Sequence, residues 1–99
     1  MRYRVGLGEP AYEDLAGIWV WIASEANLDT ADAYRARLLE FLAKLEDFPG
    51  RGAPRDDLRP GIRSLVFERT ITVFYRVDGS VVTILRIVHS ARDQTLLDI

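Results

Sequence analysis

Residues Gly61–Asp93 read GIRSLVFERTITVFYRVDGSVVTILRIVHSARD, and three β-strands can be recognised in them. The two longer strands, Ile71–Val77 and Val81–Val88, are rich in β-branched and aromatic residues, which favour extended structure. Asp78-Gly79 lies between them and is typical of a hairpin turn, because a type I′ turn needs a positive φ at both central positions. A shorter strand, Ile62–Phe67, precedes this hairpin.

A strand and two helices are predicted upstream of these strands. Tyr3–Leu7 reads as a short strand, and Glu9-Pro10 opens a helix, because the N–H that proline lacks has no partner in a first turn. Asp29 or Thr30 is expected to cap a second helix, which Phe48-Pro49-Gly50 ends. The apolar residues at helical spacing are Ala11, Leu15, Ile18, Trp19 and Ile22 in the first helix, and Ala31, Tyr34, Leu38, Phe41, Leu42 and Leu45 in the second.

The order β-α-α-β-β-β predicts an α+β fold in which an α-helical hairpin covers one face of an antiparallel β-sheet. We expect a single domain over residues 1–99. With Asp78-Gly79 as the turn, Tyr75 would oppose Val82 and Val73 would oppose Ile84 on the face that the helices cover. Gly50–Gly61 is expected to be a loop, and a last helical turn is predicted at Gln94–Leu97.

The composition excludes several kinds of functional site. The chain has no cysteine, which excludes disulfides, thiolate metal sites and a cysteine nucleophile. His89 is the only histidine and has no companions at ligand spacing, so we expect no metal, and the lack of a glycine-rich phosphate loop predicts no cofactor. No apolar run is long enough to span a bilayer and no signal peptide is visible, so a cytoplasmic protein without membrane contact is predicted.

The charge is unevenly distributed. The net charge is −2, but residues 51–99 hold eight basic and six acidic side chains, and twelve of the thirteen basic residues are arginine. Arginine favours bidentate contact with carboxylate or phosphate, so we expect a cationic partner-binding face on the C-terminal strands. The candidate partner-binding residues are Trp21, Arg63, Arg69, Arg76, Arg86, His89 and Arg92.

Each of these candidates has a structural alternative. The arginines can be ordinary solvated surface, and Arg86 can oppose Ile71 on the helix side. Trp21 is the candidate surface anchor, because its helix can offer only one of two tryptophans to the core, and Trp19 lies on the buried stripe.

RNA cleavage is the serious catalytic candidate. It needs a general base, a general acid and cations for the developing phosphorane charge, which His89 with Arg69, Arg76 and Arg92 could supply. The alternative is that His89 ends a strand and hydrogen-bonds locally while the arginines pair with neighbouring carboxylates, and we favour that reading. No catalytic residue is therefore assigned.

Three stretches carry a family resemblance: DLAGIWVWIA, FPGRGAPRDDLRPGIRSL and ITVFYRVDGSVVTILRIVHSARD. Together with the order of elements they resemble the RelE/ParE superfamily of type II toxin–antitoxin toxins, and ParE-like members in particular. The resemblance covers nearly the whole chain and implies a ParE-like toxin domain.

Members of this superfamily differ in activity, so the resemblance has to be compared with each type of member. RelE-like members are ribosome-dependent mRNA endonucleases that are strongly basic and carry two arginines and a C-terminal tyrosine or histidine. Here Thr72 stands at about the first arginine position, Arg92 could match the second, and residues 94–99 hold no Tyr, His or Lys. The acidic pI of ≈ 5.3 also argues against docking on ribosomal RNA.

The resemblance therefore implies a ParE-like toxin that inhibits DNA gyrase by binding and is not an enzyme. Its implied neutralising partner is a cognate ParD-like antitoxin, a ribbon-helix-helix protein whose C-terminal tail would bind the helical hairpin and an open sheet edge. Direct sequence-specific binding of nucleic acid is not expected. The alternatives are a RelE-like mRNA endonuclease and an inert member that only binds its antitoxin.

Overall fold

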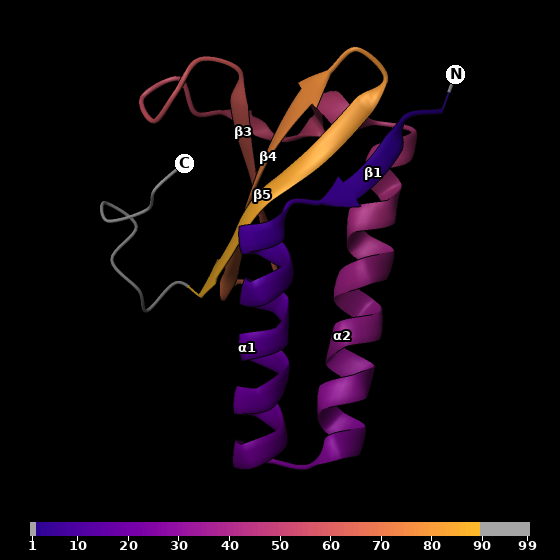
Figure 1. Ribbon diagram of the computed structural model, residues 1–99, viewed down its shortest axis with the longest axis vertical. Coiled ribbons are helices and arrows are strands. Elements are labelled where there is room, and N and C mark those ends of the chain that lie inside the picture. The colour runs from indigo at the N-terminus through magenta and orange to yellow at the C-terminus, as the bar shows by residue number, and fades with distance from the viewer. Residues whose placement is uncertain (1, 90–99) are drawn as a thin grey trace.

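Two α-helices pack on a five-stranded sheet in residues 2–89, which are the part of the chain that the computed structural model describes (Figure 1). In chain order the elements are β1 (Arg4–Leu7), α1 (Glu9–Glu25), α2 (Leu28–Ala43), two short 3-10 turns (Lys44–Glu46 and Pro49–Arg51), β2 (Ala53–Pro54), β3 (Ile62–Phe67), β4 (Ile71–Asp78) and β5 (Val81–His89). The predicted α+β class, with a helical hairpin on one face of the sheet, is confirmed. The predicted turn at Gln94–Leu97 lies outside the described residues.

The sheet is mixed, which the sequence patterns do not reveal. Its strand order is β1-β5-β4-β3-β2, and β1 runs parallel to β5, with Arg4 opposite Val81 and Leu7 opposite Ile84. The pairs β3–β4 and β4–β5 are antiparallel, as predicted. The segment Gly50–Gly61, predicted as a loop, contains the short strand β2, which pairs antiparallel with β3 at Arg63 and Ser64. Alternation of apolar residues shows which face of a strand is buried but does not show which way an edge strand runs, and the parallel pair is possible because a long connection separates its two strands.

The β4–β5 hairpin turns one residue later than predicted. Asp78 pairs with Val81, so Gly79 and Ser80 form the turn, and Gly79 has a φ of 58°. A glycine with positive φ at the first central position is the requirement of a type II′ turn, whereas the predicted type I′ turn would have centred on Asp78-Gly79. Tyr75 therefore opposes Ile84, and the predicted partner Val82 is wrong.

A bulge shifts the register again in the middle of this hairpin. Tyr75 pairs with Ile84 but Phe74 pairs with Arg86, so Leu85 is an extra residue on β5. Val73 consequently opposes Ile87 and not the predicted Ile84. The bulge inverts the alternation of β5, which places Ile84 and Ile87 on the helix face together.

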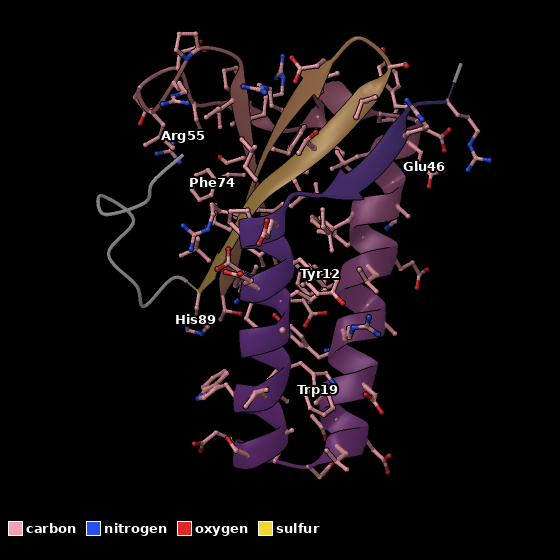
Figure 2. All side chains as sticks on the ribbon, viewed as in Figure 1. Tyr12, Trp19, Glu46, Arg55, Phe74 and His89 are labelled. Carbon is pink, nitrogen blue, oxygen red and sulfur yellow. The ribbon has the colours of Figure 1, made fainter. Side chains whose placement is uncertain are left out.

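The helix face of the sheet carries the main core. Its buried residues are Ala11, Leu15, Leu38, Leu42, Leu45, Phe67, Ile71, Val73, Tyr75, Val82, Ile84 and Ile87. A smaller cluster of Ile62, Phe74 and Val88 is packed by Leu58 and Leu85, and the guanidinium of Arg55 lies 5.5 Å from the centre of the Phe74 ring (Figure 2).

Figure 1 shows that the helical hairpin extends well past the end of the sheet. The far turns of α1 extend past the sheet alongside α2, and Ile18, Trp19 and Ile22 of the predicted stripe are only partly buried. Trp19 donates its indole N–H to the Asp32 carboxylate on α2 at 2.9 Å, which satisfies its polar atom across the hairpin. No helix in residues 2–89 is both long and apolar enough to cross a bilayer.

The second helix begins earlier than predicted. Asn27 is the N-cap, because its side-chain oxygen accepts a hydrogen bond from the Thr30 backbone N–H at 2.8 Å. The predicted cap at Asp29 or Thr30 is wrong, since both residues already belong to the first turn of α2, where Asp29 places a negative charge at the positive end of the helix dipole.

A buried tyrosine ties the second 3-10 turn to the sheet. The hydroxyl of Tyr75 donates to the Pro49 carbonyl at 2.7 Å and accepts from the Gly52 N–H at 2.8 Å. A Cβ atom added to Gly52 would lie 2.5 Å from that hydroxyl oxygen, so only glycine allows the approach. Burial raises the pKa of the Tyr75 hydroxyl above its ordinary value.

Candidate functional site

The predicted partner-binding residues occupy several separate places in the fold. Trp21 and His89 meet beside α1, Arg86 is bound to α1, and Arg63 supports a loop. Arg76 is exposed close to the β4–β5 turn. Arg92 lies outside the described residues, and partner binding by any of the set stays a prediction.

Arg86 holds α1 against β5. Its guanidinium donates to both carboxylate oxygens of Asp14, at 2.7 and 3.0 Å, and the two side chains are 21% and 12% exposed. The same carboxylate accepts the backbone N–H of Ile87 at 2.9 Å. The predicted position opposite Ile71 is wrong because of the register shift: Arg86 opposes Phe74, and His89 opposes Ile71. A structural role for Arg86 is nevertheless evident from its contacts.

Arg63 and Arg76 have short-range partners. Arg63 donates to the Gly52 carbonyl at 2.7 Å and to the Gly50 carbonyl at 3.3 Å, which supports the same 3-10 turn that Tyr75 holds. Arg76 remains exposed and donates to Asp78 at 2.8 Å, a surface contact of small energetic weight.

Arg69 lies in an unusual turn between β3 and β4. Glu68 and Arg69 have φ values of 47° and 67°, a left-handed conformation that L-residues rarely adopt. Arg37 on α2 donates two hydrogen bonds to the Glu68 carboxylate, at 2.9 and 3.1 Å, and these bonds lower the pKa of Glu68. The turn is thus fastened to α2 while the Arg69 side chain faces solvent.

Trp21 and His89 form one wall of a pocket between α1 and β5. Their ring centres are 5.6 Å apart and the ring planes meet at 71°, an edge-to-face contact. The pocket has a volume of about 450 Å³ and is lined by Glu13, Asp14, Gly17, Ile18, Trp21, Ile87 and His89. Trp21 is 53% exposed, as expected for the tryptophan that the core does not take.

A second hollow lies on the opposite side of α1, facing α2. It has a volume of about 370 Å³ and is lined by Tyr12, Leu15, Ala16, Trp19, Val20, Asp32 and Arg35. Figure 2 shows Tyr12 and Trp19 between the two helices and His89 on the other side of α1. Tyr12 and Val20, two turns apart on the same side of α1, are 63% and 59% exposed, so this hollow has apolar side chains at its surface.

Tyr12 and Val20 were not among the partner-binding residues predicted from the sequence. The available signal was a second apolar row on α1, because Tyr12, Ala16 and Val20 recur at four-residue spacing beside the buried stripe. In this two-layer fold the second apolar row of α1 is left largely exposed among the residues that the structure describes.

One edge of the sheet is also open. β2 pairs with β3 only at Arg63 and Ser64, so Leu65–Phe67 have no strand beside them on that side within residues 2–89. Val66 in this segment is 61% exposed. Such an edge can accept an added strand.

Of the postulated RNA-cleavage set, Arg76 and His89 are far apart, and Arg92 lies outside the described residues. His89 opposes Ile71, and Arg76 lies five residues further along β4, roughly 17 Å away at the rise of an extended strand. In the same residues no three side chains of histidine, aspartate or glutamate form a group that could hold a metal ion.

Comparison with known proteins identifies this arrangement of elements. The family model described as the ParE toxin of the type II toxin–antitoxin system parDE matches residues 6–94. Toxin ParE1 of Caulobacter vibrioides is 32% identical over 85 residues, 86% of each chain, and Toxin ParE3 of the same organism is 33% identical over 84 residues, 85% of this chain and 83% of that one.

Solved structures give the same answer for the fold. A chain of the chromosomal ParDE system from P. aeruginosa superposes with a TM-score of 0.78 at 26% identity, covering 89% of this chain and 96% of that one. A chain of the RelBE2 toxin–antitoxin complex from Mycobacterium tuberculosis superposes with a TM-score of 0.68 at 28% identity, covering 90% and 99%. The protein therefore belongs to the ParE family of type II toxin–antitoxin toxins, within the RelE/ParE superfamily.

Proposed function

We propose that this toxin acts by binding and inhibiting DNA gyrase, without catalysis, in the cytoplasm, and that a cognate ParD-like antitoxin neutralises it. The observation that carries the proposal is that α1 leaves large apolar side chains exposed on two sides: Tyr12 and Val20 beside α2 and Trp21 beside β5 are each more than half exposed. Such a surface is typical of a protein that works through a protein partner.

The antitoxin would use the surfaces that the fold leaves open. Its C-terminal tail would place an apolar helix in the hollow between α1 and α2, against Tyr12 and Val20, and a strand on the open edge at Leu65–Phe67. The chains with similar structures come from a ParDE system and from a RelBE2 toxin–antitoxin complex, which supports an antitoxin partner. A ribbon-helix-helix domain would complete that antitoxin.

Support for gyrase comes from family membership together with the resemblance to ParE-like toxins. The position of Arg76 far from His89 and the acidic pI of ≈ 5.3 favour binding over RNA cleavage. The ribosome-dependent mRNA endonuclease is the second candidate, because the RelBE2 chain is also similar, at 28% identity.

A supercoiling assay with purified gyrase tests the proposal. The wild type should inhibit supercoiling or trap cleaved DNA, and Arg76→Glu should do so less, because its charge projects from the exposed face of β4. Arg59→Glu reverses another exposed charge, in the loop before β3 and outside both hollows, and serves as the matched control.

A parallel assay with translating ribosomes separates the second candidate. Cleavage of mRNA mapped by primer extension should be absent. Codon-specific cuts that disappear in His89→Ala would instead assign the endonuclease activity and reject gyrase as the target.

A further inference from the structure

We propose that the pocket between α1 and β5 binds an arginine side chain presented by the antitoxin. The proposal rests on the neutralisation set out above and specifies its chemistry: a guanidinium would lie over Gly17, between the indole ring of Trp21 and the carboxylate of Glu13. Neither the hollow against α2 nor the open edge at Leu65–Phe67 takes part in this contact.

Gly17 is the first observation. It lies in the middle of α1, its φ is not positive, and a Cβ atom built on it would meet nothing within 4 Å. Glycine inside a helix is destabilising relative to alanine, so a glycine that no backbone conformation or close packing requires needs another reason. The space above Gly17 is part of the pocket, and a partner side chain can use it.

The second observation is the order of side chains along α1. Glu13, Gly17 and Trp21 follow one another at four-residue intervals, so they line one side of the helix over about 12 Å. The missing side chain at Gly17 separates a carboxylate from an aromatic ring. A planar cation placed in that gap can contact both.

Glu13 has the charge that such a ligand needs. It is exposed, and no hydrogen bond or ion pair within residues 2–89 engages it. Its neighbour Asp14 is already occupied by Arg86 and the Ile87 N–H. Among residues 2–89 the Glu13 carboxylate therefore has no partner, and its charge complements a positively charged side chain.

Trp21 provides the second contact. His89 meets it edge-to-face, and the indole still remains 53% exposed, so ring surface is available to a ligand. Guanidinium groups stack on indole faces and form forked hydrogen bonds with carboxylates, which makes arginine a better fit than the point charge of lysine. An apolar side chain would cover Glu13 without pairing it, which is unfavourable.

The first test uses the intact protein and small probes that differ only in charge. N-acetyl-arginine amide is titrated against ¹⁵N-labelled protein, and N-acetyl-citrulline amide, which has a neutral urea in place of the guanidinium, is the matched probe. The NMR signals of the Trp21 indole N–H and of the Gly17 amide should shift on titration. The dissociation constant obtained from these shifts should be about tenfold lower for the arginine probe than for the citrulline probe. Equal responses to the two probes, or to N-acetyl-lysine amide and the arginine probe, would overturn the proposal.

Substitutions of pocket residues test whether the arginine probe binds in the pocket. Glu13→Gln should weaken the arginine response about tenfold. Gly17→Leu should abolish it by filling the space. Glu25→Gln removes a charge from the same helix outside the pocket and should leave the response unchanged. Circular dichroism confirms that each variant is folded, and an unchanged response in both pocket variants would overturn the assignment.

Titration with the cognate antitoxin distinguishes failure of the arginine contact from failure of the proposed neutralisation. Glu13→Gln should weaken the complex with the cognate antitoxin at least tenfold relative to Glu25→Gln. If both variants bind the antitoxin equally, the pocket does not serve the complex and the inference fails, while neutralisation stands. If the wild type binds no antitoxin, both the proposed neutralisation and the role of the pocket in it are wrong, even if the arginine probe binds the pocket.

Discussion

Asp14 and Arg86 are 72 residues apart in the chain and form a two-pronged ion pair of 2.7 and 3.0 Å that fastens α1 to β5. β1 covers the edge of β5 only as far as Ile84, and beyond that point Asp14 accepts the Ile87 N–H. One carboxylate thus satisfies both an arginine and a strand edge that would otherwise need a neighbouring strand.

Removal of this carboxylate should be costly. Asp14→Ala would remove the carboxylate that Arg86 and the Ile87 N–H share in a poorly solvated place, so we expect a loss of about 2–4 kcal/mol in the free energy of unfolding. Urea denaturation followed by circular dichroism measures this. Glu13→Ala, next to it but exposed, should change stability by less than about 0.5 kcal/mol. Equal effects of the two substitutions would show that the ion pair carries no special weight.

Tyr75 should contribute through its hydroxyl as well as its ring. Tyr75→Phe keeps the packing but deprives the Pro49 carbonyl and the buried Gly52 N–H of their partner, so the free energy of unfolding should fall by about 1–3 kcal/mol. Tyr12→Phe removes an exposed hydroxyl and is the control. A Tyr75→Phe protein as stable as the wild type would mean that water replaces both hydrogen bonds.

The same hydroxyl gives a pH dependence. Burial raises the folded-state pKa of Tyr75 above its ordinary value of 10.0, so the unfolded chain loses this proton first as the pH rises. Stability should be fully present below pH 10 and fall as the pH rises from there through the folded-state pKa. The pH dependence of urea midpoints measures the decline, which should be shallower in Tyr75→Phe than in the wild type.

Two glycines should respond to alanine in opposite directions. Gly17→Ala meets open space in a helix and should raise stability by roughly 0.5–1 kcal/mol. Gly52→Ala would bring a Cβ atom to 2.5 Å from the Tyr75 hydroxyl oxygen and should lower the stability. Thermal unfolding of the two variants compares them directly, and a loss of stability in Gly17→Ala would show that the glycine is needed by the fold itself.

Trp21 is expected to be an anchor in the antitoxin complex. Trp21→Ala should weaken binding by more than about 1 kcal/mol if this tryptophan is an interface hot spot. Calorimetric titration with the cognate antitoxin measures the affinity. Phe48→Ala removes another exposed aromatic side chain, 68% exposed, away from both hollows. Identical affinities for the two variants would remove Trp21 from the interface.

The sequence predicts well what depends on local patterns. The strands around Tyr75, the helix that Pro10 opens and the surface position of Trp21 all follow from periodicity and turn chemistry. The parallel pairing of β1 and the bulge at Leu85 do not, because neither leaves a mark in local apolar alternation.

The candidate site was less predictable than the fold. Arginine content indicated a cationic face, but Arg63 and Arg86 are bound to groups that only tertiary structure brings near. The pocket at Gly17 could not be predicted from the sequence, because its existence depends on how closely β5 approaches α1.

The parallel pairing of β1 with β5 also sets the order in which the chain can be completed. Arg4 is synthesised 77 residues before its strand neighbour Val81, so this pair of strands forms a contact of large sequence separation. A nascent or truncated chain that lacks β5 has neither a neighbour for β1 nor an anchor for Asp14. We expect such a chain to be unfolded and harmless, so that toxicity arises only once β5 has been synthesised.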